Sequence, residues 1–115
     1  MKFKIANREI GYSEDPLIIA EIGINHNGNL DQAIAIADSA IQAGAEVLKH
    51  QTHIPDEEMS LEALKVIPGN SKHSIYKIIK KCSLSEIDES KLMKYIISKK
   101  KIFISTPFSK AAVDR

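Results

Sequence analysis

An almost unbroken aliphatic run, residues 17–24, follows Pro16 near the start of the 115-residue chain. A strand that is buried on both faces of a parallel sheet has this composition, whereas a strand with one wet face alternates apolar and polar residues. Parallel neighbours must be joined by a crossover of a dozen or more residues, usually a helix. The run therefore predicts an α/β fold in which strands alternate with helices.

The rest of the chain supplies that alternation. Strands are predicted at residues 17–24, 46–53 and 102–106. Helices are predicted at residues 30–43, 74–82, from 85 to about 99, and from within 107–115. Asn29 can cap the first helix and Gly44 can end it, while Ser85 and Asp88 form a capping box for the third. The order is that of successive βα units.

Two segments fall outside this order. Residues 54–73 contain two prolines among mixed charges, and we expect a long loop there with one helical turn around 61–65. Asn7 and Arg8 lie between two short apolar segments, which indicates a hairpin at the amino end. Long loops often carry function.

Three parallel strands with their helices leave sheet edges and helix faces uncovered, so the sequence indicates a piece of a larger fold. A (β/α)₈ barrel needs about 250 residues, and this length would hold strands one to three. We expect the amino-terminal portion of a TIM barrel, with residues 1–115 forming one partial barrel domain that is truncated at its carboxyl end.

Charge and cysteine content exclude several classes. The formal charge of +1 gives no field that would attract nucleic acid or an anionic membrane, so neither partner is expected. The single cysteine, Cys82, cannot form an intrachain disulfide, and no signal-peptide core or membrane-spanning stretch is present in the sequence. We expect a cytoplasmic protein.

Polar side chains occur where each predicted strand ends, and this is the edge where barrel sites lie. Strand alternation places Glu21 on one face of the first strand, Lys49 and Gln51 on one face of the second, and Thr106 on one face of the third. If these faces all point inward, the side chains converge. A buried carboxylate beside a buried ammonium can hold an anionic substrate and move protons.

Simpler interpretations remain open. Glu21 and Lys49 can be a satisfied ion pair or lie at exposed strand ends, and Gln51 and Thr106 can be solvated strand ends.

The histidines give no metal site in this chain. His50 and His53 are three residues apart on a strand and so face opposite ways, and no cysteine or carboxylate completes a ligand set. His26 is interpreted as shaping the loop after the first strand.

Several strings resemble the amino-terminal part of the sialic acid synthase family. They are AEIGINHNG, AGAEVLKHQTH, EEMS, VIPGN and STPFS, at residues 20–28, 43–53, 57–60, 66–70 and 105–109. The resemblance covers nearly the whole chain after residue 16. It implies a (β/α)₈ barrel, usually followed by an antifreeze-like domain, that condenses phosphoenolpyruvate with an N-acylated mannose-type sugar to give a nine-carbon 2-keto acid.

The resemblance also implies roles for individual residues. Lys49, Gln51 and Thr106 match positions that bind phosphoenolpyruvate, and Glu21 matches a glutamate that acts at the reacting centre. Asn70 matches a loop position near the sugar. The implied metal, Mn²⁺ or Mg²⁺, is held by two histidines on later strands, which this chain lacks.

The expected function is therefore that of an N-acetylneuraminate synthase, a homodimer when full length, with this chain alone inactive. A synthase of legionaminic or pseudaminic type is one alternative, and a related condensation to a seven- or eight-carbon keto acid is another. A noncatalytic unit whose strands pair with a partner chain is the alternative from a different class.

Overall fold

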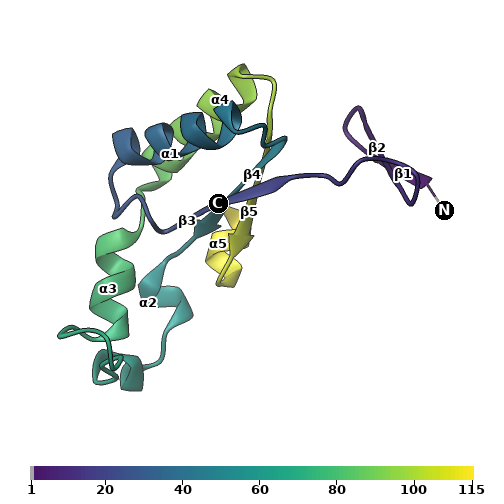
Figure 1. Ribbon diagram of the computed structural model, residues 1–115. Helices are drawn as coiled ribbons and strands as arrows, with labels where there is room; N and C mark the ends of the chain where they lie inside the picture. The colour runs from purple at the N-terminus through teal and green to yellow at the C-terminus, as the bar shows by residue number, and fades with distance from the viewer. Residues whose placement is uncertain (1) are drawn as a thin grey trace.

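The computed structural model describes residues 2–115, and its central feature is a parallel sheet of three strands in the order β3-β4-β5. These strands are Ile19–Gly23, Val47–Thr52 and Ile102–Pro107. Each lies within one or two residues of a predicted strand. Figure 1 shows them side by side, with helices packed along the sheet. The predicted α/β class is confirmed.

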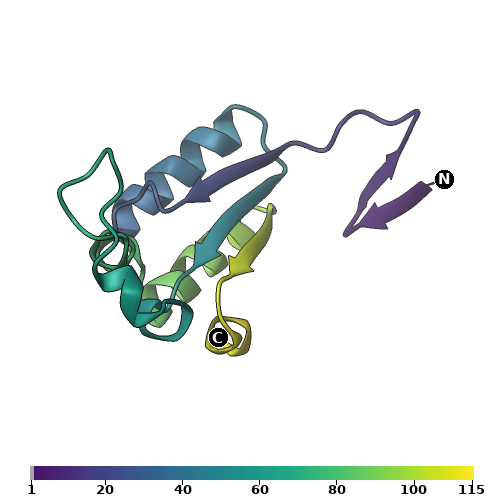
Figure 2. The ribbon, with the colours of Figure 1, turned by 90° about the horizontal axis from the view of Figure 1, so that it is seen from below.

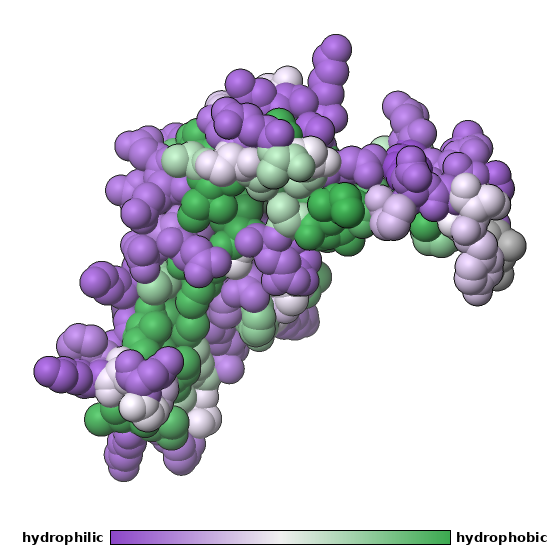
Figure 3. All heavy atoms as spheres, in the orientation of Figure 1, coloured by the Kyte–Doolittle hydropathy of each residue, from purple (hydrophilic) through white to green (hydrophobic). Residues whose placement is uncertain are grey.

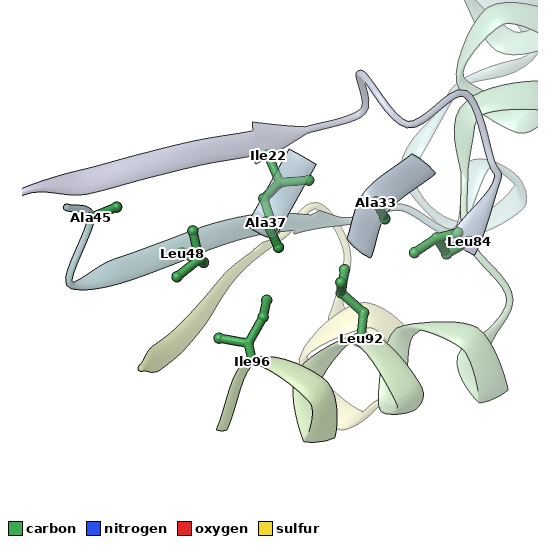
Figure 4. Close-up of a cluster of buried hydrophobic side chains, with 8 residues drawn as sticks. All are labelled: Ile22, Ala33, Ala37, Ala45, Leu48, Leu84, Leu92 and Ile96. Carbon is green, nitrogen blue, oxygen red and sulfur yellow. The ribbon is translucent and has the colours of Figure 1, made fainter. Parts of the chain in front are cut away.

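Two long helices cover one face of this sheet. Helix α1 is Leu30–Gln42 and helix α4 is Glu86–Ser98. Their inner faces and the strands enclose the main core, which Figure 4 shows in close-up and which consists of Ile22, Ala33, Ala37, Ala45, Leu48, Leu84, Leu92 and Ile96. Burying a leucine or isoleucine contributes about 1.5–3 kcal/mol, so this cluster holds the helices to the sheet.

Local sequence sets the ends of these helices as expected. The Asn29 side chain accepts a hydrogen bond from the Gln32 backbone N–H and begins α1, and Ser85 accepts one from Asp88 and begins α4. Gly44 has φ +97°, the left-handed conformation that ends a helix.

The segment between β4 and α4 is only partly irregular. It contains α2 at Pro55–Glu58, the 3₁₀ turn η1 at Leu61–Leu64, and α3 at Ile75–Cys82. The predicted turn around 61–65 and the predicted helix at 74–82 are confirmed. Helix α2 was not predicted, because four residues are too few to show a helical period. The short helix α5, Lys110–Asp114, confirms the predicted start of a helix after β5.

An antiparallel hairpin stands apart from the sheet. Its strands are β1 at Lys2–Ile5 and β2 at Arg8–Gly11, as the sequence predicts. Figures 1 and 2 both show the hairpin extending away from the helices. One ion pair, from Arg8 Nε to Glu46 Oε2 at 2.9 Å, connects it to the residue before β4.

The second face of the parallel sheet is open among residues 2–115. Ile19 and Ile104 point to this side and are 47% and 38% exposed. Figure 3 shows further hydrophobic residues at the surface beside the sheet and along the α3 region. Each helix among the described residues is too short or too polar to span a bilayer.

Candidate active site

The register of the sheet brings the predicted strand-end residues to one face. Glu21 on β3 pairs with Lys49 on β4, and Gln51 on β4 pairs with Thr106 on β5. Paired residues of parallel strands point to the same side, and Lys49 and Gln51 are two residues apart on one strand. All four side chains therefore project from the face that α1 and α4 do not cover, at or near the carboxyl edge. We call these four residues the strand-end cluster.

Glu21 and Lys49 form the charged centre of the cluster. Lys49 Nζ lies 2.7 Å from Glu21 Oε1, within reach of a charge-assisted hydrogen bond. Residues 2–115 alone do not bury this pair, since the side chains of Glu21 and Lys49 are 59% and 29% exposed, so its burial in a complete barrel stays a prediction. The described residues leave both side chains open to water, which screens the pair.

A bulge in β3 shapes the space next to the pair. The register shifts between Glu21 and Gly23, so that β3 contains one more residue than β4 at this point. Gly23 has φ +56°, and a Cβ built on it would lie 3.9 Å from Gln51 Oε1. Ile22 lies in the helix-side core, as alternation after Glu21 requires, and Gly23 places backbone without a side chain beside the Gln51 amide.

Asn70 is not brought into the cluster. It is exposed in the loop between η1 and α3, and no hydrogen bond connects it to the four strand-end residues in the part of the chain that the structure describes. Its role near a sugar stays a prediction that rests on the resemblance.

His53 extends the cluster toward α2. Its Nε2 atom lies 3.4 Å from Gln51 Oε1, and its Nδ1 atom lies 2.8 Å from Glu58 Oε1. The ring of Phe108, just after β5, stacks on His53 at 4.2 Å between centroids. Sequence reasoning did not single out Glu58 or Phe108, although both lie in strings that carry the family resemblance.

A second polar network fills the opposite, helix-side face of the sheet. His50 Nδ1 lies 3.0 Å from Glu89 Oε1, Thr52 also donates to Glu89, and Ser105 Oγ lies 2.7 Å from Thr52 Oγ1. Burial alone would raise the pKa of the Glu89 carboxyl, but hydrogen bonds from His50 and Thr52 hold that pKa below its ordinary value. Arg115 reaches the other carboxylate oxygen at 3.2 Å. This network ties α4 and α5 to the strands behind the cluster.

His26 is fully buried in the loop between β3 and α1, which it shapes as predicted. Its Nδ1 atom accepts a hydrogen bond from the Gly28 backbone at 3.1 Å, and its ring stacks on His50 with centroids 5.4 Å apart. Burial, reinforced by the nearby His50, lowers the pKa of His26 to about 4, although a contact with the Gly23 backbone opposes the shift. The imidazole is neutral at physiological pH.

No three histidine, cysteine, aspartate or glutamate side chains of residues 2–115 come together as a possible metal site. His50 and His53 lie on opposite faces of the sheet, as their spacing predicts. His50 joins the helix-side network and His53 the strand-end cluster.

The fold and the position of the cluster define the class of protein. Parallel strands with helices on the outside and functional groups at the carboxyl edge are the arrangement of a (β/α)₈ barrel, of which this chain forms a part. Comparison of the sequence with protein families then identifies the family. Residues 36–115 match the NeuB family, and the chain belongs to that family, as the resemblance implies.

The relatives agree with this assignment. The chain is 34% identical over 113 residues to the spore coat polysaccharide biosynthesis protein SpsE of Bacillus subtilis, covering 97% of this chain and 30% of that protein. It is 33% identical over 108 residues to an N,N'-diacetyllegionaminic acid synthase of Legionella pneumophila, covering 90% of this chain and 30% of the synthase. The chain therefore spans about a third of the length of these relatives.

Solved structures confirm the fold. The SpsE crystal structure superposes with a TM-score of 0.66 at 32% identity, over 99% of this chain and 30% of that one. An N-acetylneuraminic acid synthetase from Leptospira borgpetersenii, solved with citrate, gives a TM-score of 0.77 at 24% identity, over 99% of this chain and 36% of that one.

Proposed function

We propose that the complete protein carrying this sequence condenses phosphoenolpyruvate with an N-acylated mannose-type sugar. The products are a nine-carbon 2-keto sugar acid and phosphate, and the preferred assignment is N-acetylneuraminate made from N-acetylmannosamine. The observation that carries the proposal is the strand-end cluster, in which one ammonium, one amide and one hydroxyl share a face with one carboxylate. Membership in the NeuB family supports it.

The donors of the cluster suit a doubly anionic substrate. The Lys49 ammonium, the Gln51 amide and the Thr106 hydroxyl can each donate to phosphate or carboxylate oxygens, and the bonds from Lys49 are charge-assisted. Lys49 already holds the Glu21 carboxylate at 2.7 Å, so its Nζ is oriented toward the β3 side before any substrate arrives. Glu21 is an acceptor only, so its partners are sugar hydroxyls or water.

The reaction balances with these groups. C3 of phosphoenolpyruvate forms a bond to the aldehyde carbon of the sugar, which leaves an oxocarbenium-like centre at C2. Water adds to C2, and the proton that it loses is balanced by the one that the former aldehyde oxygen takes up to become a hydroxyl. The C2 hydroxyl then gives up its proton as the bond from C2 to the phosphate oxygen breaks, which leaves the ketone and hydrogen phosphate. We assign Glu21 to orient the sugar or the attacking water, and the three donors to hold the departing phosphate and the carboxylate.

A divalent cation, Mn²⁺ or Mg²⁺, would polarise the sugar aldehyde when bound. The side chains of the strand-end cluster would bind such a cation poorly, because a positively charged ammonium occupies the centre of the cluster. We therefore propose that its ligands lie on other strands of the barrel.

A second substrate class is favoured by the relatives. Two legionaminic acid synthases and two pseudaminic acid synthases are 28–33% identical to this chain over 102–108 residues. The second candidate function is the same condensation with a sugar of that type.

The remaining proposals concern the setting of the protein. We assign it to the cytoplasm, as a homodimer, without nucleic acid or membrane partners. The noncatalytic alternative, in which the strands only pair with a partner chain, gives no role to the hydrogen-bond donors of the strand-end cluster.

The deciding experiment gives the purified complete protein phosphoenolpyruvate and one sugar at a time, and measures phosphate release and product mass. We expect turnover with N-acetylmannosamine and the mass of N-acetylneuraminate. Turnover only with a diacetylated sugar would move the assignment to the second candidate. Absence of phosphate release with every N-acylated sugar, in a folded protein supplied with Mn²⁺ or Mg²⁺, would refute the condensation.

A further inference from the structure

The imidazole of His53 is held on both of its nitrogens and on one ring face. Its side chain and that of Glu58 are 6% and 5% exposed, so the pair is buried although the cluster beside it is open. Glu58 lies on α2 and places both carboxylate oxygens near His53 Nδ1, at 2.8 and 3.1 Å. The ring has no freedom to swing away from β4.

Phe108 closes the third side. It stacks on His53 at 4.2 Å, and its backbone N–H donates to the Thr52 carbonyl at 3.3 Å. This places the turn after β5 against the end of β4. Three elements thus hold one ring: α2, β4 and the segment after β5.

Both polar partners of the ring are hydrogen-bond acceptors. A carboxylate faces Nδ1 and an amide oxygen, Gln51 Oε1, faces Nε2 at 3.4 Å. In this arrangement Nδ1 donates to the Glu58 carboxylate and Nε2 donates to the amide oxygen of Gln51.

We propose that Glu58 and His53 are positioning residues that fix the orientation of the Gln51 amide. With its oxygen held by His53, the amide turns its NH₂ group away from His53 and toward the face shared with Lys49. A neutral His53 would instead leave a lone pair at Nε2, and the amide would reverse and present an acceptor. This inference rests on the proposed function, because an amide NH₂ at this place serves an anion such as phosphoenolpyruvate.

The kinetic test uses the complete protein and two variants that break the chain of contacts. Glu58→Gln removes the counterion at nearly constant shape, and His53→Leu removes both donors. For each we expect a KM for phosphoenolpyruvate raised about tenfold, the value of one hydrogen bond, with kcat within about twofold of wild type. His53→Gln retains a donor near the Nε2 position, so it should restore most of the affinity.

Two further variants separate positioning from general stability. Glu57→Gln changes the same charge on the same short helix, at an exposed position, and should leave KM unchanged. Gln51→Ala removes the group that is positioned, so Glu58→Gln added to it should raise KM no further. Full additivity of these two substitutions, or an unchanged KM in Glu58→Gln, would overturn the proposal.

A spectroscopic measurement tests the same contacts without turnover. With ¹⁵N-labelled histidine at neutral pH, the two ring nitrogens of His53, assigned by their loss in His53→Gln, should both resonate as protonated nitrogens. In Glu58→Gln one of them should shift to the position of an unprotonated nitrogen. A single protonated nitrogen in the wild-type protein would overturn the positioning role whether or not the protein turns over phosphoenolpyruvate. Loss of turnover with the doubly protonated signal intact would refute only the proposed function.

Discussion

At the scale of single residues, the sheet register gives Lys49 its importance. It is paired across β3 with Glu21 and across β5 with Ile104, so its ammonium stands at the centre of the open face. Most other lysines of the described residues are exposed to water, among them Lys4 in the hairpin and Lys77 and Lys94 on helices. An ammonium beside a carboxylate at a barrel edge is the group that an anionic substrate would contact first.

Replacing Lys49 by alanine tests this directly. A hydrogen bond to a charged group contributes about 1.5–3 kcal/mol, so Lys49→Ala in the complete protein should raise the KM for phosphoenolpyruvate by roughly 10- to 100-fold or abolish turnover. Lys94→Ala, at an exposed position of α4, is the matched loss of charge and should leave the kinetics unchanged. Wild-type kinetics in Lys49→Ala would remove this residue from the site.

His26 predicts a pH dependence of stability. Its pKa is about 4 in the folded chain against 6.5 when unfolded, so the unfolded state binds more protons between these values. The free energy of unfolding therefore falls as the pH decreases from 7, by about 2 kcal/mol at pH 5 from this residue alone.

Urea unfolding at pH 7 and pH 5 measures this change. His26→Asn keeps an acceptor for the Gly28 N–H but cannot be protonated, so its stability should fall less between the two pH values. His50, which stacks on His26, and the nearby Glu89 are present in both proteins. Their own contributions to the pH dependence of stability therefore cancel in the comparison. Equal pH dependence in both proteins would assign the loss to other groups.

At the scale of elements, the loop from β3 to α1 depends on Gly28. Its φ is +73°, and a Cβ there would overlap the backbone carbonyl oxygen of Lys81 at the end of α3. That carbonyl belongs to a helix and cannot move aside at low cost. The loop and α3 are therefore packed backbone to backbone through this glycine.

The substitution Gly28→Ala should lower the free energy of unfolding by about 3 kcal/mol, because strain and overlap both apply. Gly44 is the control, since its φ of +97° is equally unfavourable for alanine but no atom lies within 4 Å of the added Cβ. Gly44→Ala should cost about 1–2 kcal/mol, from backbone strain alone. Equal losses in denaturant unfolding would show that the contact with α3 adds nothing.

The sequence predicts the elements well wherever a local signal exists. Residues 17–24 and 46–53 carry unbroken or alternating apolar patterns, and both become strands of the predicted sheet. Asn29 and Ser85 mark helix starts through a side-chain bond to a nearby backbone N–H, which needs no distant partner. Local chemistry decides these features, so a single sequence is enough to find them.

The site is predicted only in part, because its remaining features depend on distant contacts. Alternation is enough to put Lys49 and Gln51 on one face. The bulge at Gly23 follows from packing between strands, and a glycine within the predicted strand is its only local signal. The Glu58–His53 pair forms because α2 folds back on β4, and a four-residue helix gives no periodic signal. The burial of Glu21 stays a prediction, because it depends on what covers the open face of the sheet and no local pattern in the sequence reports it.

At the scale of the whole molecule, the two faces of the sheet differ in what they require. The helix side has a buried core and a hydrogen-bonded polar network around Glu89, in which the Nε2 atom of His50 has no partner among the described residues. The cluster side exposes both Ile19 and the Glu21 carboxylate to water among the described residues. Electrostatic catalysis needs a site from which water is excluded, because low dielectric strengthens each contact.

The 115-residue chain alone should therefore not catalyse the proposed condensation. In water the Lys49–Glu21 pair is screened, and the remaining strands of a barrel are needed to bury it, so we expect phosphate release at least about a thousandfold below that of the complete protein. The assay mixes the purified chain with phosphoenolpyruvate, N-acetylmannosamine and Mn²⁺, with circular dichroism to establish that it is folded and the complete protein as the positive control. Phosphate release by the folded chain at a rate near that of the control, lost in Lys49→Ala, would show that three strands suffice and that burial of the pair is not required.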